Sequence, residues 1–227
     1  MKSTSRCIKL GFFVFLLLFP QIFYAHPAWV QEGVVANYQG IGSFKKDGQY
    51  QGGAQMNIVE RVDSVSNGRI VVTSTFTEPT SGYTFTNSSS YGPNDIFGAF
   101  WVDDRAAQNA KDGDKVGIFT VKRGPYQDLN GKIWSNAVML ESKDKVEIRA
   151  IYDERTGLLI HYAEVYPNQE TYIDFKSINV DLSTYQTPAG VGDGGTNETG
   201  AGGGFNLPCC GGIFLIFAGF CLALVKG

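Results

Sequence analysis

Ten short runs of β-branched and aromatic residues, each ended by turn residues, fill most of the chain between residues 33 and 180. Short runs with period-two alternation are typical of antiparallel strands. A further short stretch, 103–111, predicts a helix that Asp103 or Asp104 caps. The sequence therefore predicts one all-β domain over residues 26–182. The ten expected strands are 33–44, 54–65, 69–78, 82–87, 97–102, 115–122, 132–141, 145–152, 157–166 and 171–180.

The separators between these runs have specific turn chemistry. Asn67-Gly68 and Asn130-Gly131 are Asn-Gly pairs, which supply the positive φ angles of tight hairpins. Asp153 is placed to accept from backbone amides in an Asx-turn, and Gly157 to supply a left-handed residue before the next strand. These turns predict hairpin connections between neighbouring antiparallel strands.

The alternation predicts strands with one buried and one wet face. In 145–152 the apolar and charged side chains alternate, which suits a sheet packed on one side only, in a sandwich or a curved half-barrel. The run 97–102 differs, because it is apolar on both faces and so predicts a central strand. Both architectures remain open at this point.

The two ends of the chain differ in composition from its middle. Residues 1–25 combine a basic start, an apolar run over 10–19 and a polar stretch that ends in Ala25, which predicts a secretory signal peptide cleaved after Ala25. Residues 183–206 are rich in glycine and threonine and predict a flexible linker. Residues 207–227 are apolar up to Lys226 and predict a transmembrane anchor or sorting signal that leaves the β domain outside.

The tail resembles the tripartite C-terminal sorting signals of surface proteins, which have a short motif, an apolar helix and a basic end. Its residues Leu207-Pro208-Cys209-Cys210-Gly211 are similar to the Leu-Pro-any-Thr-Gly motif of sortase substrates, with Cys210 in place of threonine. The tail is equally similar to related sorting signals that contain cysteine or Gly-Gly. Alternatives are a glycosylphosphatidylinositol signal, acylation of Cys209 and Cys210, or a buried helix of a soluble domain.

A second resemblance concerns the central sheet. Residues 152–159 read Tyr-Asp-Glu-Arg-Thr-Gly-Leu-Leu, and this segment is similar to one in exported antiparallel-sheet proteins, including the lipoprotein carriers LolA and LolB. The match covers mainly residues 115–180. The resemblance implies a curved half-barrel whose concave side holds acyl chains.

Charge and cysteine content exclude some classes of function. Of the 19 basic residues, three lie in the leader and one in the tail. Residues 26–208 therefore contain 15 basic residues and all 22 acidic residues, which gives a net charge of −7. Because the sequence has no stripe of basic residues, we do not expect the protein to bind nucleic acid. The four cysteines are Cys7, Cys209, Cys210 and Cys221, so thiol chemistry is not expected in the domain.

Candidate catalytic and metal-binding residues are few. His161 is expected to be a partly buried strand residue on one face with Leu159, Ala163 and Val165, and His26 lies beside the cleavage site. Carboxylate oxygens are suitable calcium ligands, but the aspartates of this sequence lack the regular spacing of a calcium-binding loop. We therefore interpret them as helix caps and turn residues. No catalytic, cofactor-binding or metal-binding residue is predicted. The aspartates concerned are Asp95, Asp103, Asp104, Asp112 and Asp114.

Three functional hypotheses follow. The first is a membrane-tethered cell-surface domain with a non-enzymatic structural or binding role, whose ligand is hydrophobic or belongs to the cell envelope. The second is a lipid or lipoprotein carrier with a hydrophobic concavity, and an empty, well-packed interior would contradict it. The third is a surface hydrolase, which would need two carboxylates facing one cleft.

Overall fold

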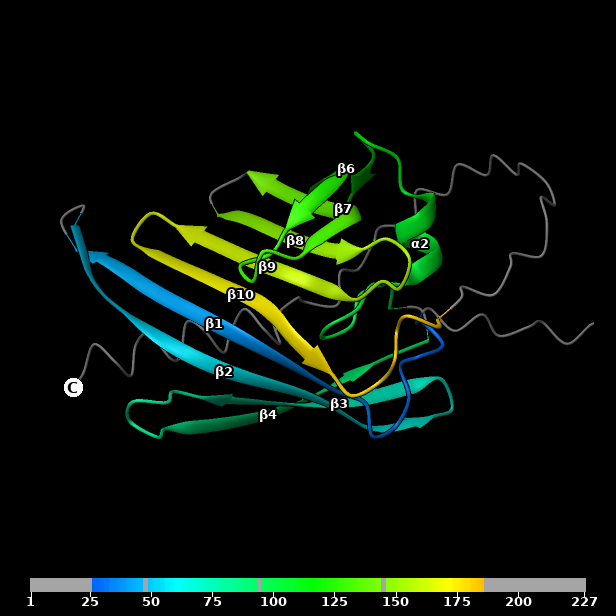
Figure 1. The fold of residues 1–227 in the computed structure, drawn as a ribbon, viewed down its shortest axis with the longest axis horizontal. Helices are drawn as coiled ribbons and strands as arrows, with labels where there is room; N and C mark the ends of the chain where they lie inside the picture. The colour runs from blue at the N-terminus through cyan, green and yellow to red at the C-terminus, as the bar shows by residue number, and fades with distance from the viewer. Residues whose placement is uncertain (1–25, 47–48, 94, 144–145, 186–227) are drawn as a thin grey trace, which may run out of the picture.

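The structure, a computed structural model, describes residues 26–46, 49–93, 95–143 and 146–185 (Figure 1). The predicted leader and tail lie outside these residues, as do Ala25, Cys209, Cys210 and most of the predicted linker. No helix in the described part of the chain has the length and apolarity that a membrane span requires.

Among the described residues, ten strands form one open antiparallel sheet in the order β4-β3-β2-β1-β10-β9-β8-β7-β6-β5. The all-β prediction is confirmed, and the single sheet excludes the sandwich. Figure 1 shows that the sheet is strongly curved and so has a concave and a convex face. The strands are β1 (Val35–Lys46), β2 (Gln49–Ser66), β3 (Arg69–Thr77), β4 (Thr84–Tyr91), β5 (Lys115–Val116), β6 (Phe119–Gln127), β7 (Ile133–Lys143), β8 (Glu147–Asp153), β9 (Leu159–Tyr166) and β10 (Gln169–Ile178).

The connection between β4 and β5 crosses the whole sheet, because these consecutive strands lie at opposite edges. We call residues 92–114 the crossing segment. It contains the helix α2 (Asp104–Asn109) and lies against the concave face, where its Phe100 and Trp101 are fully buried with the side chains of the sheet. The crossing segment thus supplies the second layer of the fold.

The prediction of a central strand at 97–102 is wrong. These residues form only isolated bridges, between Phe97 and Val102 and between Trp101 and Leu158. Both sides of the segment are apolar because it is buried between the concave face of the sheet and other residues of the crossing segment. A short buried segment without regular structure has the same composition as a buried strand.

The turn predictions at Asn67-Gly68 and at Asp153 and Gly157 are confirmed. At Asn130-Gly131 only Gly131 has a positive φ, of 80°, and the pair lies in a longer connection over 128–132 between β6 and β7. Asn67 and Gly68 adopt positive φ angles of 49° and 72° between β2 and β3. Asp153 accepts hydrogen bonds from the backbone nitrogen and hydroxyl of Thr156 at 3.1 and 2.5 Å. Asp103 caps α2 by accepting from the amide of Ala106 at 2.7 Å. The predicted strand 115–122 is divided into β5 and β6 at a glycine with a φ of 59°.

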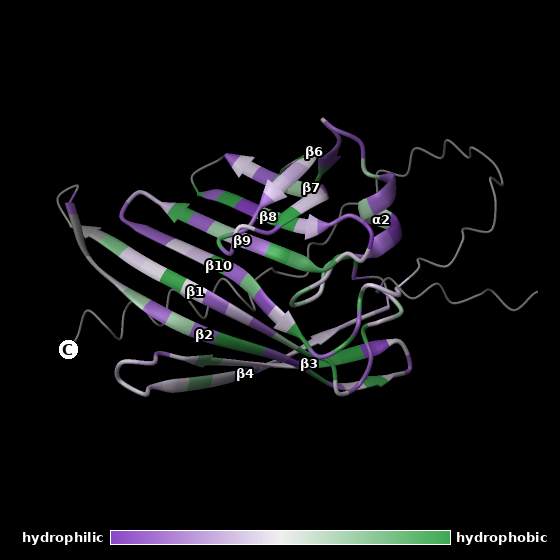
Figure 2. Ribbon diagram, in the orientation of Figure 1, coloured by the Kyte–Doolittle hydropathy of each residue, from purple (hydrophilic) through white to green (hydrophobic). Residues whose placement is uncertain are grey.

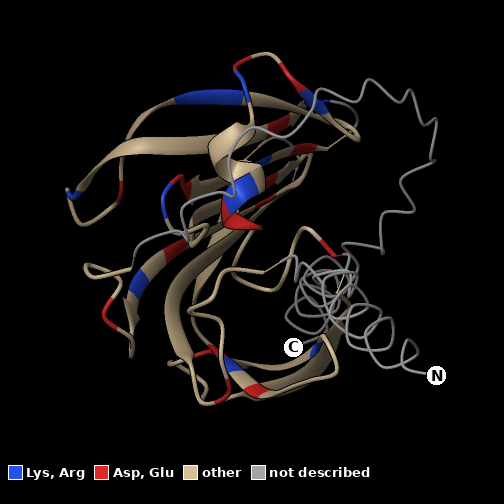
Figure 3. Ribbon diagram, turned by 90° about the vertical axis from the view of Figure 1, so that its right-hand side faces the viewer, with Lys and Arg blue, Asp and Glu red and all other residues tan. Residues whose placement is uncertain are grey.

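The main core lies between the concave face and the crossing segment. In β3 every second residue is buried, and the inward row of β2 and β3 is mostly aliphatic or aromatic. Figure 2 shows the same alternation of apolar and polar bands along the strands. In Figure 3, acidic and basic segments are interspersed over the side of the molecule that faces the viewer. The inward residues are Met56, Ile58, Glu60, Val62, Ile70, Val72, Ser74 and Phe76.

A smaller core lies on the convex face, beneath the hairpin of β6 and β7. The tip of this hairpin reaches β10, where Lys176 donates to the Asn130 side chain at 3.3 Å. Ala137, Ile151 and Ile160 are buried in this second core. The hairpin therefore folds back over β8, β9 and β10 and covers part of the face that alternation would leave wet.

Gly157 joins the crossing segment to the sheet, because its carbonyl accepts from the Val102 amide at 2.8 Å. Its φ is 70°, and a Cβ atom there would lie 2.2 Å from the Val102 carbonyl oxygen. Gly82 has the same φ of 70°, but a Cβ atom added there would have no other atom within 4 Å. Gly82 is therefore a matched control.

We expect Gly82→Ala to lower the free energy of unfolding by about 1 kcal/mol, the cost of a left-handed alanine. Gly157→Ala adds the steric clash and should cost about 1–3 kcal/mol more. Urea unfolding followed by tryptophan fluorescence measures both values. Equal losses for the two variants would show that the contact between Gly157 and Val102 is not tight.

Candidate ligand pocket

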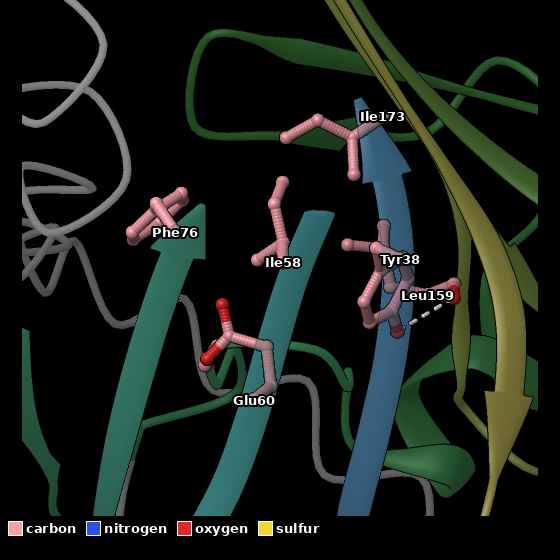
Figure 4. A pocket seen from close by; sticks show the side chains of 7 residues that line it. Tyr38, Ile58, Glu60, Phe76, Leu159 and Ile173 are labelled. Carbon is pink, nitrogen blue, oxygen red and sulfur yellow. Dashed lines mark hydrogen bonds between the residues drawn. The ribbon is translucent and has the colours of Figure 1, made fainter. Parts of the chain in front are cut away.

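A pocket lies between the concave face and the crossing segment. Figure 4 shows its lining, which comes from five neighbouring strands of the sheet, β3, β2, β1, β10 and β9, and from the crossing segment. The hollow measures about 270 Å³ when the solvent at its open mouth is included, and its enclosed part is about 10 Å³. In this closed state the pocket has room for about one water. The lining residues are Tyr38 from β1, Ile58 and Glu60 from β2, Phe76 from β3, Ala99 from the crossing segment, Leu159 from β9 and Ile173 from β10.

Glu60 is the acidic residue of this lining. Period-two alternation along β2 directs it inward between the buried Ile58 and Val62, and its exposed fraction is 3%. The Ser74 hydroxyl, from the directly opposite position of β3, donates to its Oε2 at 2.6 Å. Among the described residues, no Lys, Arg or His side chain forms an ion pair with it.

Burial determines the protonation of Glu60. Desolvation raises the pKa of its carboxyl from 4.5 to about 7, and the hydrogen bond from Ser74 offsets only part of this effect. The pKa of the Tyr38 phenol is also raised, first by burial and then by repulsion from Glu60. Tyr38 donates to the backbone carbonyl of Leu159 at 3.0 Å (Figure 4). The pocket therefore contains a carboxyl group that changes charge near neutral pH.

A second buried acid, Glu164, lies elsewhere on the concave face. Its neighbours are Tyr166, whose hydroxyl donates to it in a short hydrogen bond, and Tyr162 at 3.4 Å, and burial raises its pKa. Glu164 of β9 pairs with Thr171 of β10, which in turn pairs with Gly42 of β1. Glu60 of β2 pairs with Ala36 of β1. The two acids are thus six residues apart along β1 and do not line the same pocket.

His161 lies on the convex face rather than with Leu159. A bulge between β8 and β9 places Leu159 opposite Tyr152 in the main core and His161 opposite Ile151 in the second core. The prediction that His161 is a partly buried strand residue is confirmed in kind, since His161 lies in β9 with an exposed fraction of 8%, but its predicted shared face with Leu159 is wrong. The Nδ1 atom of His161 is 2.9 Å from the carboxylate of Asp174, and both groups are buried beneath the β6–β7 hairpin.

The aspartates considered as calcium ligands mostly bond to backbone amides. Asp95 accepts from Gly92 at 2.6 Å, Asp112 from Arg123 at 3.1 Å and Asp114 from Lys111 at 2.7 Å. Asp103 and Asp104 lie at the start of α2. Within the described residues, no group of three or more His, Cys, Asp or Glu is placed to hold a metal ion.

The crossing segment also contains an unsatisfied donor. The Trp101 indole is 1% exposed, and its Nε1 is the one buried side-chain nitrogen or oxygen without a hydrogen-bond partner in the described part of the chain. The ring packs on Gly98 and makes an edge contact with Tyr91 at 5.3 Å between centroids. A buried donor without an acceptor typically costs about 1–3 kcal/mol, so this packing is not optimal.

Comparison with known proteins gives weak structural likenesses only. No protein-family model and no curated protein matches the sequence. One similar solved structure is MucB in complex with MucA(peri), with 15% identity and a TM-score of 0.33 over 63% of this chain and 50% of that chain, so the chain spans half the length of that structure. Another is a putative outer membrane lipoprotein-sorting protein domain from Vibrio parahaemolyticus, with 11% identity and a TM-score of 0.26 over 68% of this chain and 87% of that chain.

A TM-score below 0.5 carries no argument about function. The case for a binding site therefore rests on the pocket itself. Reasoning from sequence missed Glu60, although one signal was present, namely an acid in the apolar row of Met56, Ile58 and Val62.

The Glu60 carboxyl makes stability depend on pH. Its folded-state pKa of about 7 exceeds the unfolded value of 4.5, so the folded protein binds more protons and loses stability as pH rises through 7. A shift of this size corresponds to a loss of up to about 3 kcal/mol between pH 4.5 and pH 8.5. Glu60→Gln keeps the shape and removes the charge, so its advantage over the wild type should grow by about that amount.

Urea unfolding at pH 4.5, 6.5 and 8.5 measures this difference. Glu164 is present in both proteins, and its own effect cancels. Glu32→Gln, at an exposed acid, should follow the wild type at every pH. A constant difference between Glu60→Gln and the wild type across this range would show that Glu60 has an ordinary pKa.

Proposed function

We propose that the chain is an exported, membrane-tethered binding domain that holds a small hydrophobic ligand between its concave sheet and the crossing segment. The observation that carries this proposal is the pocket, which has an open mouth and a lining that is apolar except for Glu60 and the Tyr38 hydroxyl. Pockets with mostly apolar walls and a few fixed polar groups are the usual form of small-molecule sites.

The attachment of the crossing segment supports this role. Its middle part is joined to the sheet by the backbone of Val102, which donates to Gly157, and of Phe100, which accepts from Leu159 at 3.0 Å. Its end is joined to Val121 of β6 through Gly113 and Asp114. None of the ten-strand ladders runs through it. The middle part can therefore move away from the sheet at the cost of the two bonds of Phe100 and Val102 and of the isolated Trp101–Leu158 bridge, and the unsatisfied Trp101 donor lowers the cost of that movement.

The closed state limits the size of the ligand. The concavity is largely filled by Phe100 and Trp101, and a lipid carrier would need these side chains to leave it. The packed interior therefore favours a small ligand over a full acyl chain. It also keeps a purely structural role as the second candidate, because a filled concavity is what a protein without a ligand would have.

Binding of an uncharged fluorescent probe, N-phenyl-1-naphthylamine, tests the proposal on the full chain in lipid nanodiscs. Ala99→Leu places three more carbons in the pocket and should lower the affinity for the probe about tenfold or more, since overpacking costs about 1–3 kcal/mol. Ala106→Leu makes the same change at a half-buried position of α2 outside the lining and should bind as the wild type does.

Probe fluorescence is corrected with empty nanodiscs. Absence of saturable binding to the wild type would favour the structural role. Equal binding by Ala99→Leu and the wild type would place the probe outside this pocket. Mass spectrometry of an organic extract from the purified protein then identifies any apolar compound that the cell supplies.

The membrane location rests on the composition of the two ends. We propose export through residues 1–25 and anchoring through residues 207–227, with the β domain outside the membrane and without enzymatic activity. Deletion of 207–227 should move the protein from the membrane fraction to the soluble fraction, as seen by immunoblot.

A double variant, Cys209→Ala and Cys210→Ala, separates an apolar span from a lipid anchor. If the span alone suffices, this variant stays in the membrane fraction, and its intact mass differs from the wild type only by the two sulfur atoms. Loss from the membrane, with a larger mass difference, would assign anchoring to acylated cysteines. A soluble wild-type protein would contradict the anchor.

A further inference from the structure

The pocket contains a carboxyl group that has no counter-charge among the described residues. Glu60 is fully enclosed by the sheet and the crossing segment, and its one described hydrogen-bond donor is the neutral Ser74 hydroxyl. An ionised carboxylate in such surroundings is costly unless a cation compensates it. In most folded proteins that cation is a neighbouring Lys or Arg, which the described residues do not supply here.

Two aromatic rings complete the surroundings of this charge. Ile58, the next inward residue of β2 after Glu60, is opposite Tyr38 on β1 and Phe76 on β3. Figure 4 shows Tyr38 and Phe76 on either side of the strand that carries Glu60. Aromatic faces attract cations through their quadrupole, most strongly in sites that are shielded from water.

We infer that the ligand of this pocket is an amphiphilic amine, a short apolar chain with an ammonium group that pairs with Glu60 in the space that the rings of Tyr38 and Phe76 also line. The inference rests on the proposed function, because it assigns the chemical class of the ligand in the same pocket. An anionic headgroup would meet the Glu60 carboxylate, and a neutral one would leave that charge uncompensated. The ammonium satisfies the carboxylate and the aromatic rings together.

The pocket in the structure has room for about one water, so a headgroup and a short chain enter it only when the crossing segment moves away from the sheet. The apolar walls of Ile58, Leu159 and Ile173 are then suited to a few methylene groups. The acid is thus the specific element, and the aliphatic walls supply affinity without distinguishing one headgroup from another.

Three ligands with the same six-carbon chain test the inference: hexylammonium, 1-hexanol and hexanoate. Each competes with N-phenyl-1-naphthylamine on the full chain in nanodiscs at pH 7.5. We expect hexylammonium to bind about tenfold more tightly than hexanol, since a hydrogen bond to a charged group contributes about 1.4 kcal/mol or more. Hexanoate should be the weakest of the three.

Glu60→Gln should reduce the preference for hexylammonium over hexanol to about twofold or less, since the charge is gone and the rings remain. The matched control Glu32→Gln, at an exposed acid, should keep the full preference. Direct partition of each compound into empty nanodiscs is subtracted.

The outcomes separate this inference from the function on which it rests. If the probe binds and is displaced equally well by hexanol and hexylammonium, or if Glu60→Gln keeps the preference, the amine assignment is wrong and the binding domain stands. The same holds if the probe binds and none of the three compounds displaces it. If the probe does not bind the wild type, the proposed function fails and the amine assignment fails with it.

Discussion

Consecutive strands β4 and β5 lie at opposite edges of one curved sheet, and the chain between them must cross a face of that sheet. It crosses the concave face, and most of the remaining structure depends on this route. The crossing segment buries the inward row of the strands, covers the pocket in part and keeps Glu60 buried. A ten-stranded sheet with one bare apolar face would not be stable in solution, so the crossing segment is as necessary to the fold as the strands are.

Glu60 shows how such a fold can retain a site that reduces its stability. Every other inward residue of β2 from Met56 to Val62 is apolar, and an aliphatic residue at position 60 would pack without any cost of desolvation. Departures of this kind from the local pattern are expected where a protein has a function. Glu164 is a comparable departure, but its hydrogen bonds from Tyr162 and Tyr166 satisfy it within the protein, so it does not need a ligand.

The sequence was sufficient for features with local causes and insufficient for those that depend on the overall path of the chain. The turns at Asn67-Gly68 and at Gly157, and the cap at Asp103, follow from the conformations that these residues prefer. The segment 97–102 was misread because burial beneath a sheet and burial inside one produce the same composition. The contact of His161 with Asp174 depends on a bulge and on a hairpin that folds back, and neither has a local signal.

The closed pocket also determines how a ligand would act on the protein. Moving Phe100 and Trp101 out of the core costs about 1.5–3 kcal/mol for each side chain, and hydration of the Trp101 donor returns part of this. The closed state should therefore predominate in the free protein, and a ligand can open it only through contacts that the closed state lacks. An ammonium headgroup that pairs with Glu60 supplies such a contact once it reaches the buried carboxylate. An uncharged chain must displace the aromatic side chains without that gain, so the same acid that destabilises the empty protein would select its ligand.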